Sequence, residues 1–389
     1  MTEITAVIDL GKSLAKTIWT VDSSSKREIL FLEPEIVNLT ANDIANTKRE
    51  NADPERDAWL VLPDGRGEAF GFITRTSSYR NRRKLGQDEL KTVNGVNRCL
   101  AILGSIAERA GVADYKDNDE SNLSVPLNKV TEFSVTLRIL LPLSEWSTSQ
   151  EFKDNLLDAL QSGFNFRGVQ YRVQVQTLEV TTEGSGLLKT RQLQLINSAY
   201  RNRAISCLIM GHYNNSLFLY EGGQQIVADC SSNGFYQLVD TIVSQTALDS
   251  SNVASGDLTQ AIYEATSDST LVQALLWQKV KSRKQLQQQV NQAVETIKRT
   301  RAEFWESIVD WIYRTLGPNF LKVNEVLITG GSSRFFQHNI EEFFGDSDID
   351  ILWSCQLNKL VSRDFNIPAE DNLSYRLSDV YGVFNDLIT

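Results

Sequence analysis

The chain has 389 residues, which is longer than one hydrophobic core usually serves, so we expect two lobes. It has 41% hydrophobic and 23% charged residues, the balance of a soluble globular protein. A net charge of −10 argues against broad direct binding of nucleic acid, and two histidines are too few for a histidine-rich metal site. No apolar run is long enough to span a membrane, and the N-terminal residues lack the pattern of a signal peptide, so we expect a cytoplasmic protein without a membrane segment.

The four cysteines predict free thiols rather than disulfides or zinc ligands. They are far apart in the sequence, form no CxxC pair, and three of them lie in apolar or strand-like surroundings. They are Cys99, Cys207, Cys230 and Cys355.

Residues 6–21 predict a β-hairpin that is suited to bind phosphate. An apolar run ends at Asp9, a short turn of Gly11, Lys12 and Ser13 follows, and residues 14–21 alternate as a second strand. Glycine lets backbone N–H groups converge on an anion, Ser13 adds a hydroxyl, and Lys12 or Lys16 adds positive charge. Asp9 is placed to hold a hydrated Mg²⁺ beside those phosphates.

Two other interpretations of this hairpin are possible from its residues alone. The Gly-Lys-Ser triplet suggests a P-loop, but that motif needs a glycine where Ala6 stands and a helix where a strand is predicted, so it is excluded. An ordinary surface hairpin remains the alternative if the hairpin is considered alone.

The next segments predict a strand over residues 28–37, a polar surface excursion over residues 39–57, and a strand–turn–strand over residues 59–72. The basic residues 79–84 predict a solvated loop, with contact to nucleic acid or an adaptor as the alternative. Residues 94–110 have apolar side chains at helical spacing and predict a helix.

A buried strand is predicted over residues 133–143, a helix over residues 150–160, and an alternating strand over residues 168–180. The last strand ends in a Thr-Glu-Gly-Ser-Gly turn that contains Glu183. Glu183 is either a functional carboxylate or an acid that favours the start of a helix, and the two flanking glycines favour the functional interpretation.

Residues 204–220 predict a second hairpin, with its turn at residues 211–215. Polar groups of Gly211, His212, Asn214, Asn215 and Ser216 are suited to cradle phosphate. The imidazole of His212 has an equally plain alternative role, a local hydrogen bond within the turn.

Helices are predicted over residues 233–248 and 258–266, followed by a long helical segment over residues 272–316. A strict heptad repeat is not kept, so packing against a lobe is favoured over a coiled coil. Forty-five residues of unbroken helix would exceed the size of a lobe, so a break is expected.

Residues 323–329 predict a strand that runs into Gly330-Gly331 and then a helix. The glycine pair lets the backbone approach a flat ring or a ribose, and the start of the new helix favours phosphate. Ser332 and Arg334 are further candidates for nucleotide contact. A terminal helix containing Gly382 is expected to cross the helix that holds Gly95 and Gly104.

Four segments in this order resemble the motifs of the actin-like ATPases, and of the plasmid-segregation actins (ParM-like) in particular. The first hairpin, D-x-G-x-S-x-x-K from Asp9 to Lys16, resembles the first phosphate loop, and the second hairpin resembles the second phosphate loop. Residues 323–333 resemble the adenosine motif, and residues 379–387 the second connecting segment.

The resemblance implies an α/β fold, actin-like (ribonuclease H-like), with two lobes that each contain a mixed five-stranded sheet. Residues 1–200 with 366–389 would form lobe I and residues 201–365 lobe II, with ATP or GTP and Mg²⁺ in the cleft between them. The implied function is nucleotide-dependent polymerisation into filaments with hydrolysis, for DNA segregation through an adaptor or for a cytoskeletal role. Glu183 would orient the attacking water, and Asp9 would lie near the metal.

One residue departs from the family's pattern. The second phosphate loop usually begins with an aspartate, and Met210 stands at that place, so slow hydrolysis is expected. Two alternatives remain open at this point: a phosphotransferase of the sugar-kinase type, and a filament protein that is gated by nucleotide but does not hydrolyse it.

Overall fold

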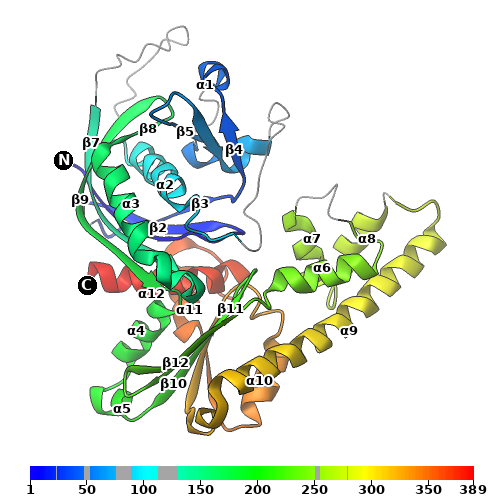
Figure 1. Cartoon of the computed structure of the whole chain (residues 1–389). Coiled ribbons are helices and arrows are strands. Elements are labelled where there is room, and N and C mark those ends of the chain that lie inside the picture. The colour runs from blue at the N-terminus through cyan, green and yellow to red at the C-terminus, as the bar shows by residue number, and fades with distance from the viewer. Residues whose placement is uncertain (23, 48–52, 76–88, 113–129, 250–254, 278) are drawn as a thin grey trace. The chain divides into compact units, whose positions relative to one another are not determined.

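A computed structural model of the chain is shown in Figure 1. The structure describes residues 1–22, 24–47, 53–75, 89–112, 130–249, 255–277 and 279–389. The basic residues 79–84 lie outside the described residues. The chain divides into two compact units, the first made of Met1–Gln194 and Ser354–Thr389 and the second of Leu195–Trp353. Within the described ranges, every helix is too short or too polar to cross a membrane.

The first unit contains a mixed sheet of nine strands in the order β3-β2-β1-β7-β9-β8-β5-β6-β4. Strand β1 pairs antiparallel with β2 and parallel with β7, and β7 pairs parallel with β9. The strands are β1 (Glu3–Asp9), β2 (Ala15–Val21), β3 (Glu28–Leu32), β4 (Ile36–Leu39), β5 (Ala58–Val61), β6 (Gly67–Phe70), β7 (Val130–Leu141), β8 (Phe164–Phe166) and β9 (Val169–Thr182).

The second unit contains a mixed sheet of five strands in the order β12-β11-β10-β13-β14. Strand β10 pairs antiparallel with β11 and parallel with β13, and β13 pairs parallel with β14. The strands are β10 (Ala204–Met210), β11 (Asn215–Glu221), β12 (Gln224–Ser231), β13 (Glu325–Thr329) and β14 (Asp350–Trp353). This sheet therefore has the same strand order and directions as β3-β2-β1-β7-β9 of the first unit.

The α/β fold class with two mixed sheets is confirmed, but the expected count of five strands is wrong for the first unit. Four short strands extend its sheet beyond β9, because the polar-looking residues after β3 contain enough apolar side chains to form a small core of their own. That core consists of Val37, Leu39, Trp59, Ala69 and Ile73. The strand expected over residues 28–37 is divided into β3 and β4 around Pro34, whose ring nitrogen cannot donate a hydrogen bond.

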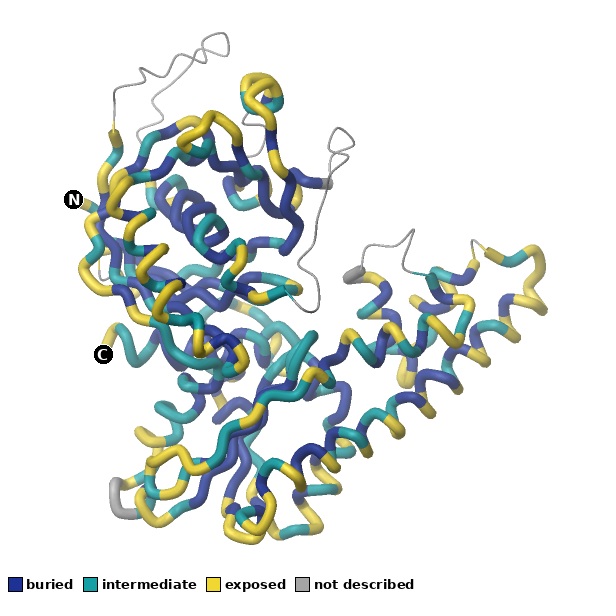
Figure 2. The backbone as a smooth tube through the Cα atoms, viewed as in Figure 1, coloured by how far each residue is buried: buried dark blue, intermediate teal, exposed yellow. Residues whose placement is uncertain are grey.

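Helices cover both faces of the first unit's sheet (Figure 1). Helices α2 and α3 pack on one face with the main core, while α11 and α12 pack on the other against Val7, Ile18 and Leu140. Figure 2 shows that α2 is buried along most of its length. The helices of this unit are α1 (Ala41–Asn46), α2 (Gly95–Arg109), α3 (Ser149–Ser162), α4 (Ser185–Gln194), α11 (Leu357–Phe365) and α12 (Asn372–Ile388), with 3-10 turns η1 (Pro54–Arg56), η2 (Gly71–Arg75), η3 (Leu143–Thr148) and η5 (Ser354–Gln356).

Two expectations about this unit are corrected. Helix α11 was assigned to lobe II by the boundary at residue 366, but it lies in the first unit because its buried Leu357 and Val361 pack with α12. Gly382 on α12 meets α4 rather than α2, with the backbone of Gly186 as its neighbour. On α2, Gly95 instead faces the ring of Phe152.

The second unit packs its helices on the sheet around one core that includes Leu208, Ile297, Ile328 and Ile340. The break expected in the long helical segment is confirmed: α8 ends at Trp277 and α9 begins at Arg283. The helices are α5 (Asn197–Arg201), α6 (Phe235–Gln245), α7 (Ser255–Glu264), α8 (Thr270–Trp277), α9 (Arg283–Leu316) and α10 (Gln337–Gly345), with the 3-10 turn η4 (Gly317–Lys322). All four cysteines of the chain are free thiols, as expected.

Candidate functional site

The first hairpin brings Asp9 and Lys16 together. Asp9 is the last residue of β1 and pairs across the hairpin with Lys16 of β2. The Lys16 Nζ lies 2.5 Å from Asp9 Oδ2, and both side chains are about nine-tenths buried. Burial disfavours the charged carboxylate, but Lys16 and Lys91 outweigh it and hold the pKa of Asp9 well below its usual range.

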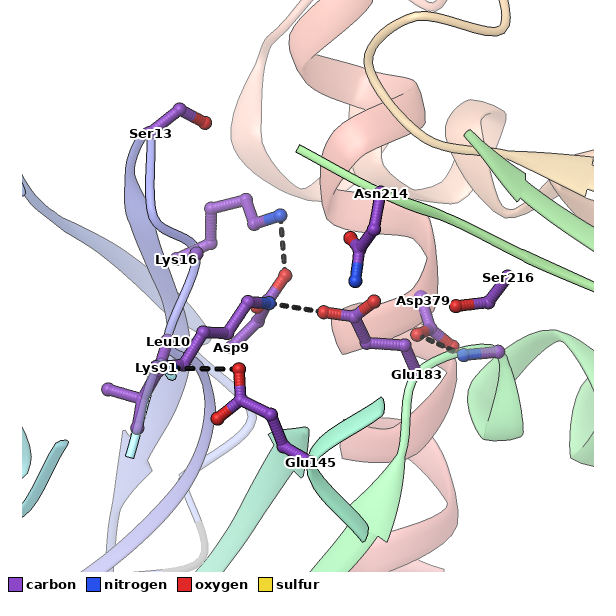
Figure 3. Close-up of polar contacts among 12 residues, drawn as sticks. Asp9, Leu10, Ser13, Lys16, Lys91, Glu145, Glu183, Asn214, Ser216 and Asp379 are labelled. Atoms are coloured by element: carbon purple, nitrogen blue, oxygen red, sulfur yellow. Dashed lines mark hydrogen bonds and ion pairs between the residues drawn. The ribbon is translucent and has the colours of Figure 1, made fainter. Parts of the chain in front are cut away.

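Lys91 is one of several residues of this site that were not predicted from the sequence. Its Nζ lies 3.4 Å from Asp9 Oδ1 and also forms a short ion pair with Glu183 (Figure 3). The Lys91 side chain is only 9% exposed. Burial lowers the pKa of a lysine, but the carboxylates of Glu183 and Asp9 reverse this and raise the pKa of Lys91 above its usual value. Asp9 ends β1 and Glu183 follows β9, so the two acids are far apart in the sequence. In the structure they share the ammonium group of Lys91.

Glu145 fixes the backbone from which Lys91 extends. Its carboxylate is buried, at 2% exposure, and accepts hydrogen bonds from the backbone N–H groups of Lys91 and Thr92, at 2.8 and 3.1 Å. Both oxygens of Glu145 are therefore used to hold the turn that leads into α2. This pairing places the Lys91 side chain by its main chain as well as by its charge.

Glu183 follows β9, and its turn is held by Asp379 of α12. The Asp379 carboxylate accepts hydrogen bonds from the backbone N–H groups of Gly184 and Gly186, at 2.6 and 2.9 Å. The first turn of α4 is therefore capped by Asp379, while the Glu183 carboxylate is directed to Lys91. This geometry is unlike that of an acid that merely caps its own helix, and it supports the functional interpretation of Glu183.

Asp379 has a perturbed ionisation. Burial raises the pKa of Asp379 to about 7 and outweighs the opposing hydrogen bonds from Gly184 and Gly186, while the negative charges of Glu183 and Asp9 add smaller contributions in the same direction as burial. A buried carboxyl group with this pKa changes its charge near neutral pH.

The remaining residues of the first turn are held by two arginines. Arg98, which is fully buried in α2, donates to the carbonyl oxygens of Leu10 and Gly11 at 3.2 and 2.9 Å. Burial lowers the pKa of Arg98 to about 10. The hydroxyl of Ser13, which is exposed, lies 3.4 Å from an Arg376 nitrogen, and Lys12 is half-buried beside it.

The residues that the sequence analysis missed gave only faint signals. Arg98 is a charged residue inside the apolar helix, and such a residue usually has a fixed partner. Asp379 directly precedes the segment that contains Gly382. Lys91 and Glu145 lie in turns, where charged residues are ordinary, so nothing in their surroundings distinguished them.

The second hairpin places Met210 where the first has Asp9. Met210 is the last residue of β10 and pairs with Asn215, as Asp9 pairs with Lys16. Gly211 donates its N–H to the Asn214 carbonyl at 2.9 Å, which closes the turn. The Met210 side chain is fully buried in the second unit's core, so this turn has no acid at its start.

The polar side chains next to this turn have partners within the second unit. Asn215 and Ser216 are each about 1% exposed. The Asn215 amide donates to the carbonyl of Asn233 at 2.5 Å, and the Ser216 hydroxyl contacts the thiol of Cys230 at 3.8 Å. Asn214 also contacts Cys230, and the His212 ring lies edge-to-face on Tyr213. Asn215 and Ser216 thus have structural partners, and the turn itself offers Gly211, His212 and Asn214.

The glycine pair after β13 packs against the second hairpin. Gly330 has a φ of 103°, and a Cβ there would lie 2.2 Å from the Met210 carbonyl oxygen. Ser332 donates its backbone N–H to Met210 and its hydroxyl to Gly211, each at 3.2 Å. Gly330 is therefore required by the close approach of β10, and the half-buried Gly331 is the one of the two glycines that stays a candidate for ligand contact.

The helix expected directly after Gly331 begins later than expected. Turns cover the following residues, and α10 begins at Gln337. The Ser333 hydroxyl donates to the Gly330 carbonyl at 2.7 Å, a local hydrogen bond of the kind that competes with helix. These turns bring Arg334 to a pocket of about 320 Å³ within the second unit, lined by Tyr263, Thr266, Ser267, Arg301, Arg334, Phe335, Gln337, His338 and Glu341.

A divalent cation has few protein ligands in either unit. Among the described residues, no three His, Cys, Asp or Glu side chains are arranged to hold a metal ion by themselves. Asp9 and Glu183 supply the oxygen ligands that Mg²⁺ prefers, and Mg²⁺ commonly uses one or two carboxylates together with water and substrate phosphates. The donor set of the first unit therefore fits Mg²⁺ bound with a nucleotide rather than a metal site made by protein alone.

Comparisons with known proteins find likeness in structure rather than in sequence. No protein-family model matches the chain, and no curated protein matches it. Among solved structures, the actin-like protein Alp7A has 13% identity and a TM-score of 0.61, with 99% of this chain and 96% of that chain covered. A 15-stranded ParM filament from Clostridium botulinum has 12% identity and a TM-score of 0.60, with 100% and 99% covered.

A further structure is that of an archaeal actin homologue, Ta0583, in complex with ADP. It has 12% identity and a TM-score of 0.57, and 98% of each chain is covered. Likeness at this level of identity concerns the fold, and it extends over nearly the whole length of each protein. The chain therefore has the actin-like fold that ParM, Alp7A and the archaeal actin homologue share.

Proposed function

We propose that this protein is a nucleotide-dependent filament protein that binds ATP or GTP with Mg²⁺, assembles with copies of itself and hydrolyses the nucleotide slowly. Its proposed role is the segregation of DNA through an adaptor protein, or a cytoskeletal role in the cytoplasm. Support comes from the fold, which is shared with a ParM filament and with an actin homologue that binds ADP.

The observation that carries the proposal is the charged cluster of the first unit. Asp9, Lys16, Lys91 and Glu183 meet at the end of the first hairpin, and all four are about nine-tenths buried. Buried charges of this kind are costly to maintain unless they serve a function or a precise pairing. The same strand order recurs in the second unit, where a second glycine turn offers backbone amides. Backbone amides of either turn would be able to bind phosphate oxygens.

Each residue of the cluster has a proposed task in phosphoryl transfer to water. Lys12, Lys16 and the N–H groups of the first turn would bind phosphate oxygens, with Gly211, His212 and Asn214 on the second turn. When bound, Mg²⁺ neutralises charge on the phosphate oxygens, and Asp9 would hold it through water.

The catalytic task is proposed for Glu183, whose carboxylate would orient the attacking water. Asp379 keeps the backbone of its turn in place.

The pocket of the second unit is the proposed site for the base. The rings of Phe335 and Tyr263 line this pocket, and the Arg301 guanidinium lies 5.0 Å from the centre of the Phe335 ring. A pocket lined by aromatic rings is suited to bind a flat aromatic base. Arg334 lines this pocket, Gly331 lies three residues before it in the same turn, and Ser332 joins that turn to the second hairpin.

Sedimentation and electron microscopy of the purified protein, with and without Mg-ATP or Mg-GTP, test the proposal. Filaments should form only with nucleotide, because binding selects one arrangement of the units that a filament contact requires. Flat light scattering with every nucleotide, across a wide range of protein concentration, would contradict it. Phosphate transfer to sugar hydroxyls in the same samples would favour a sugar-kinase-type enzyme instead.

A second candidate function is a filament that binds nucleotide without hydrolysing it. Met210 favours this candidate, because a buried thioether at the end of β10 can orient neither metal nor water. Phosphate release measured beside sedimentation separates the two: assembly without any release identifies the non-hydrolysing filament.

A further inference from the structure

Both oxygens of Asp9 are already occupied by the protein's own cations. Lys16 lies on Oδ2 at 2.5 Å and Lys91 on Oδ1 at 3.4 Å. Lys91 also holds the Glu183 carboxylate, so one ammonium group spans the two acids that are proposed for metal and water. A divalent cation that binds both Asp9 and Glu183 therefore has to compete with this ammonium group.

The backbone of Lys91 is held in place by hydrogen bonds to a buried carboxylate. The buried Glu145 carboxylate binds the backbone N–H groups of Lys91 and of the next residue, Thr92. This bidentate contact fixes the backbone from which the Lys91 side chain extends. Four methylene groups let the ammonium group move while its backbone stays in place.

We propose that Lys91 is an internal counter-cation of the nucleotide-free protein, and that a divalent cation and the Lys91 ammonium group compete for Asp9 and Glu183. Glu145 is the tether that keeps Lys91 within reach of both carboxylates. The inference deepens the proposed function and rests on its assignment of Asp9 and Glu183. It gives the site a reason to take up metal together with a nucleotide, because phosphate oxygens offer the displaced ammonium group a new anionic partner.

Binding of Mn²⁺ to the nucleotide-free, full-length protein tests the proposed competition and does not depend on catalytic activity. Titration is followed by the loss of the free Mn²⁺ signal in electron paramagnetic resonance. Lys91→Met keeps the length of the side chain and removes its charge, and it should bind Mn²⁺ about tenfold more tightly or better, because like charges a few ångström apart repel by several RT. Lys153→Met on α3 is the matched control, and it should bind Mn²⁺ as the parent does.

Two further variants locate the effect. Adding Asp9→Asn to Lys91→Met should remove the gain, which shows that the metal lies on Asp9. Glu145→Gln, which loosens the tether but leaves the lysine, should give a smaller gain than Lys91→Met. Glu145→Gln also keeps the inference testable if Lys91→Met fails to fold, as judged by circular dichroism.

The results also separate this inference from the proposed function. If folded Lys91→Met and Glu145→Gln bind Mn²⁺ no more tightly than the parent, the competition does not exist and the inference is wrong. Binding of fluorescent ATP and GTP analogues is measured separately on the same proteins. Failure of the parent to bind either analogue would overturn the proposed function, whereas the Mn²⁺ result would still stand on its own.

Discussion

Gly382 and Gly186 lie in direct backbone contact where α12 crosses α4. A Cβ on Gly382 would lie 2.5 Å from the Gly186 carbonyl oxygen, and a Cβ on Gly186 would lie 2.1 Å from the Asp379 carbonyl oxygen. These distances leave no space for a side chain at either of the two glycine positions. The crossing holds α4, and with it the turn of Glu183, against the C-terminal helix.

The first prediction follows from this crossing. Gly382→Ala should destabilise the protein by about 1–3 kcal/mol, because the added methyl group forces two packed helices apart. Thermal unfolding by circular dichroism measures the change. Gly345→Ala on α10 is the matched control, since a Cβ there meets nothing within 4 Å, and it should leave the melting temperature nearly unchanged. Equal stability of the two variants would show that the α4–α12 crossing can relax at little cost.

The second prediction concerns pH. The pKa of Asp379 is raised to about 7 from a value of 3.8 in a free side chain, so between these values the folded protein binds a proton that the unfolded chain has lost. Stability from this group is therefore greatest in acid and falls as pH rises from about 4 to about 7, with a slope of at most about 1.4 kcal/mol per pH unit. Urea unfolding from pH 4.5 to 7.5 measures it.

Asp379→Asn supplies the comparison for that measurement. It cannot ionise, so the difference in stability between parent and variant should shift in favour of the variant as pH rises. The depressed pKa of Asp9 acts in more acid solution, because stability from a carboxylate with a lowered pKa is lost only below its unfolded value of 3.8. A difference that stays constant over the whole range would show that Asp379 does not titrate there.

The third prediction concerns Glu183. Glu183→Gln should lower the rate of phosphate release by about a hundredfold or more, the usual loss when a group that positions water or charge is removed. Assembly should remain, since phosphate binding is assigned to the two turns. Release and sedimentation are measured on the same samples. Glu179→Gln on β9, the strand that precedes Glu183, is the control, because Glu179 is half-exposed and pairs with Arg138. If assembly is lost while turnover is unchanged, Glu183 has a structural role.

The fourth prediction separates the two adjacent glycines. Gly331→Leu should remove nucleotide binding by filling the space beside the proposed base pocket, while the second unit stays folded. Gly330→Ala should instead unfold this unit more readily, because its Cβ meets the Met210 backbone at 2.2 Å and its φ of 103° is unfavourable for alanine. Equilibrium binding of a fluorescent nucleotide, beside thermal unfolding, distinguishes the effects. Normal binding by a folded Gly331→Leu would show that the base lies elsewhere.

The sequence by itself determined the features that depend on neighbouring residues. Alternating apolar residues and glycine turns located both hairpins, and the apolar spacing located α2, α3 and the strands β7, β9 and β13. The break before α9 followed from length alone. The first hairpin was located correctly, and its short turn is what sets Asp9 opposite Lys16 in the structure.

Only the tertiary structure decided which distant residues meet. Lys91 is 82 residues from Asp9 and 92 from Glu183, and Asp379 is 195 from Gly184, so no local pattern could pair them. Gly330 looked like a ligand contact until β10 was placed against it, and the four additional strands of the first sheet depended on a small core that forms only when they pair. The physical reason is burial. A charged group that is removed from water is unfavourable unless it is paired, and its partner can come from any part of the chain that the fold places beside it.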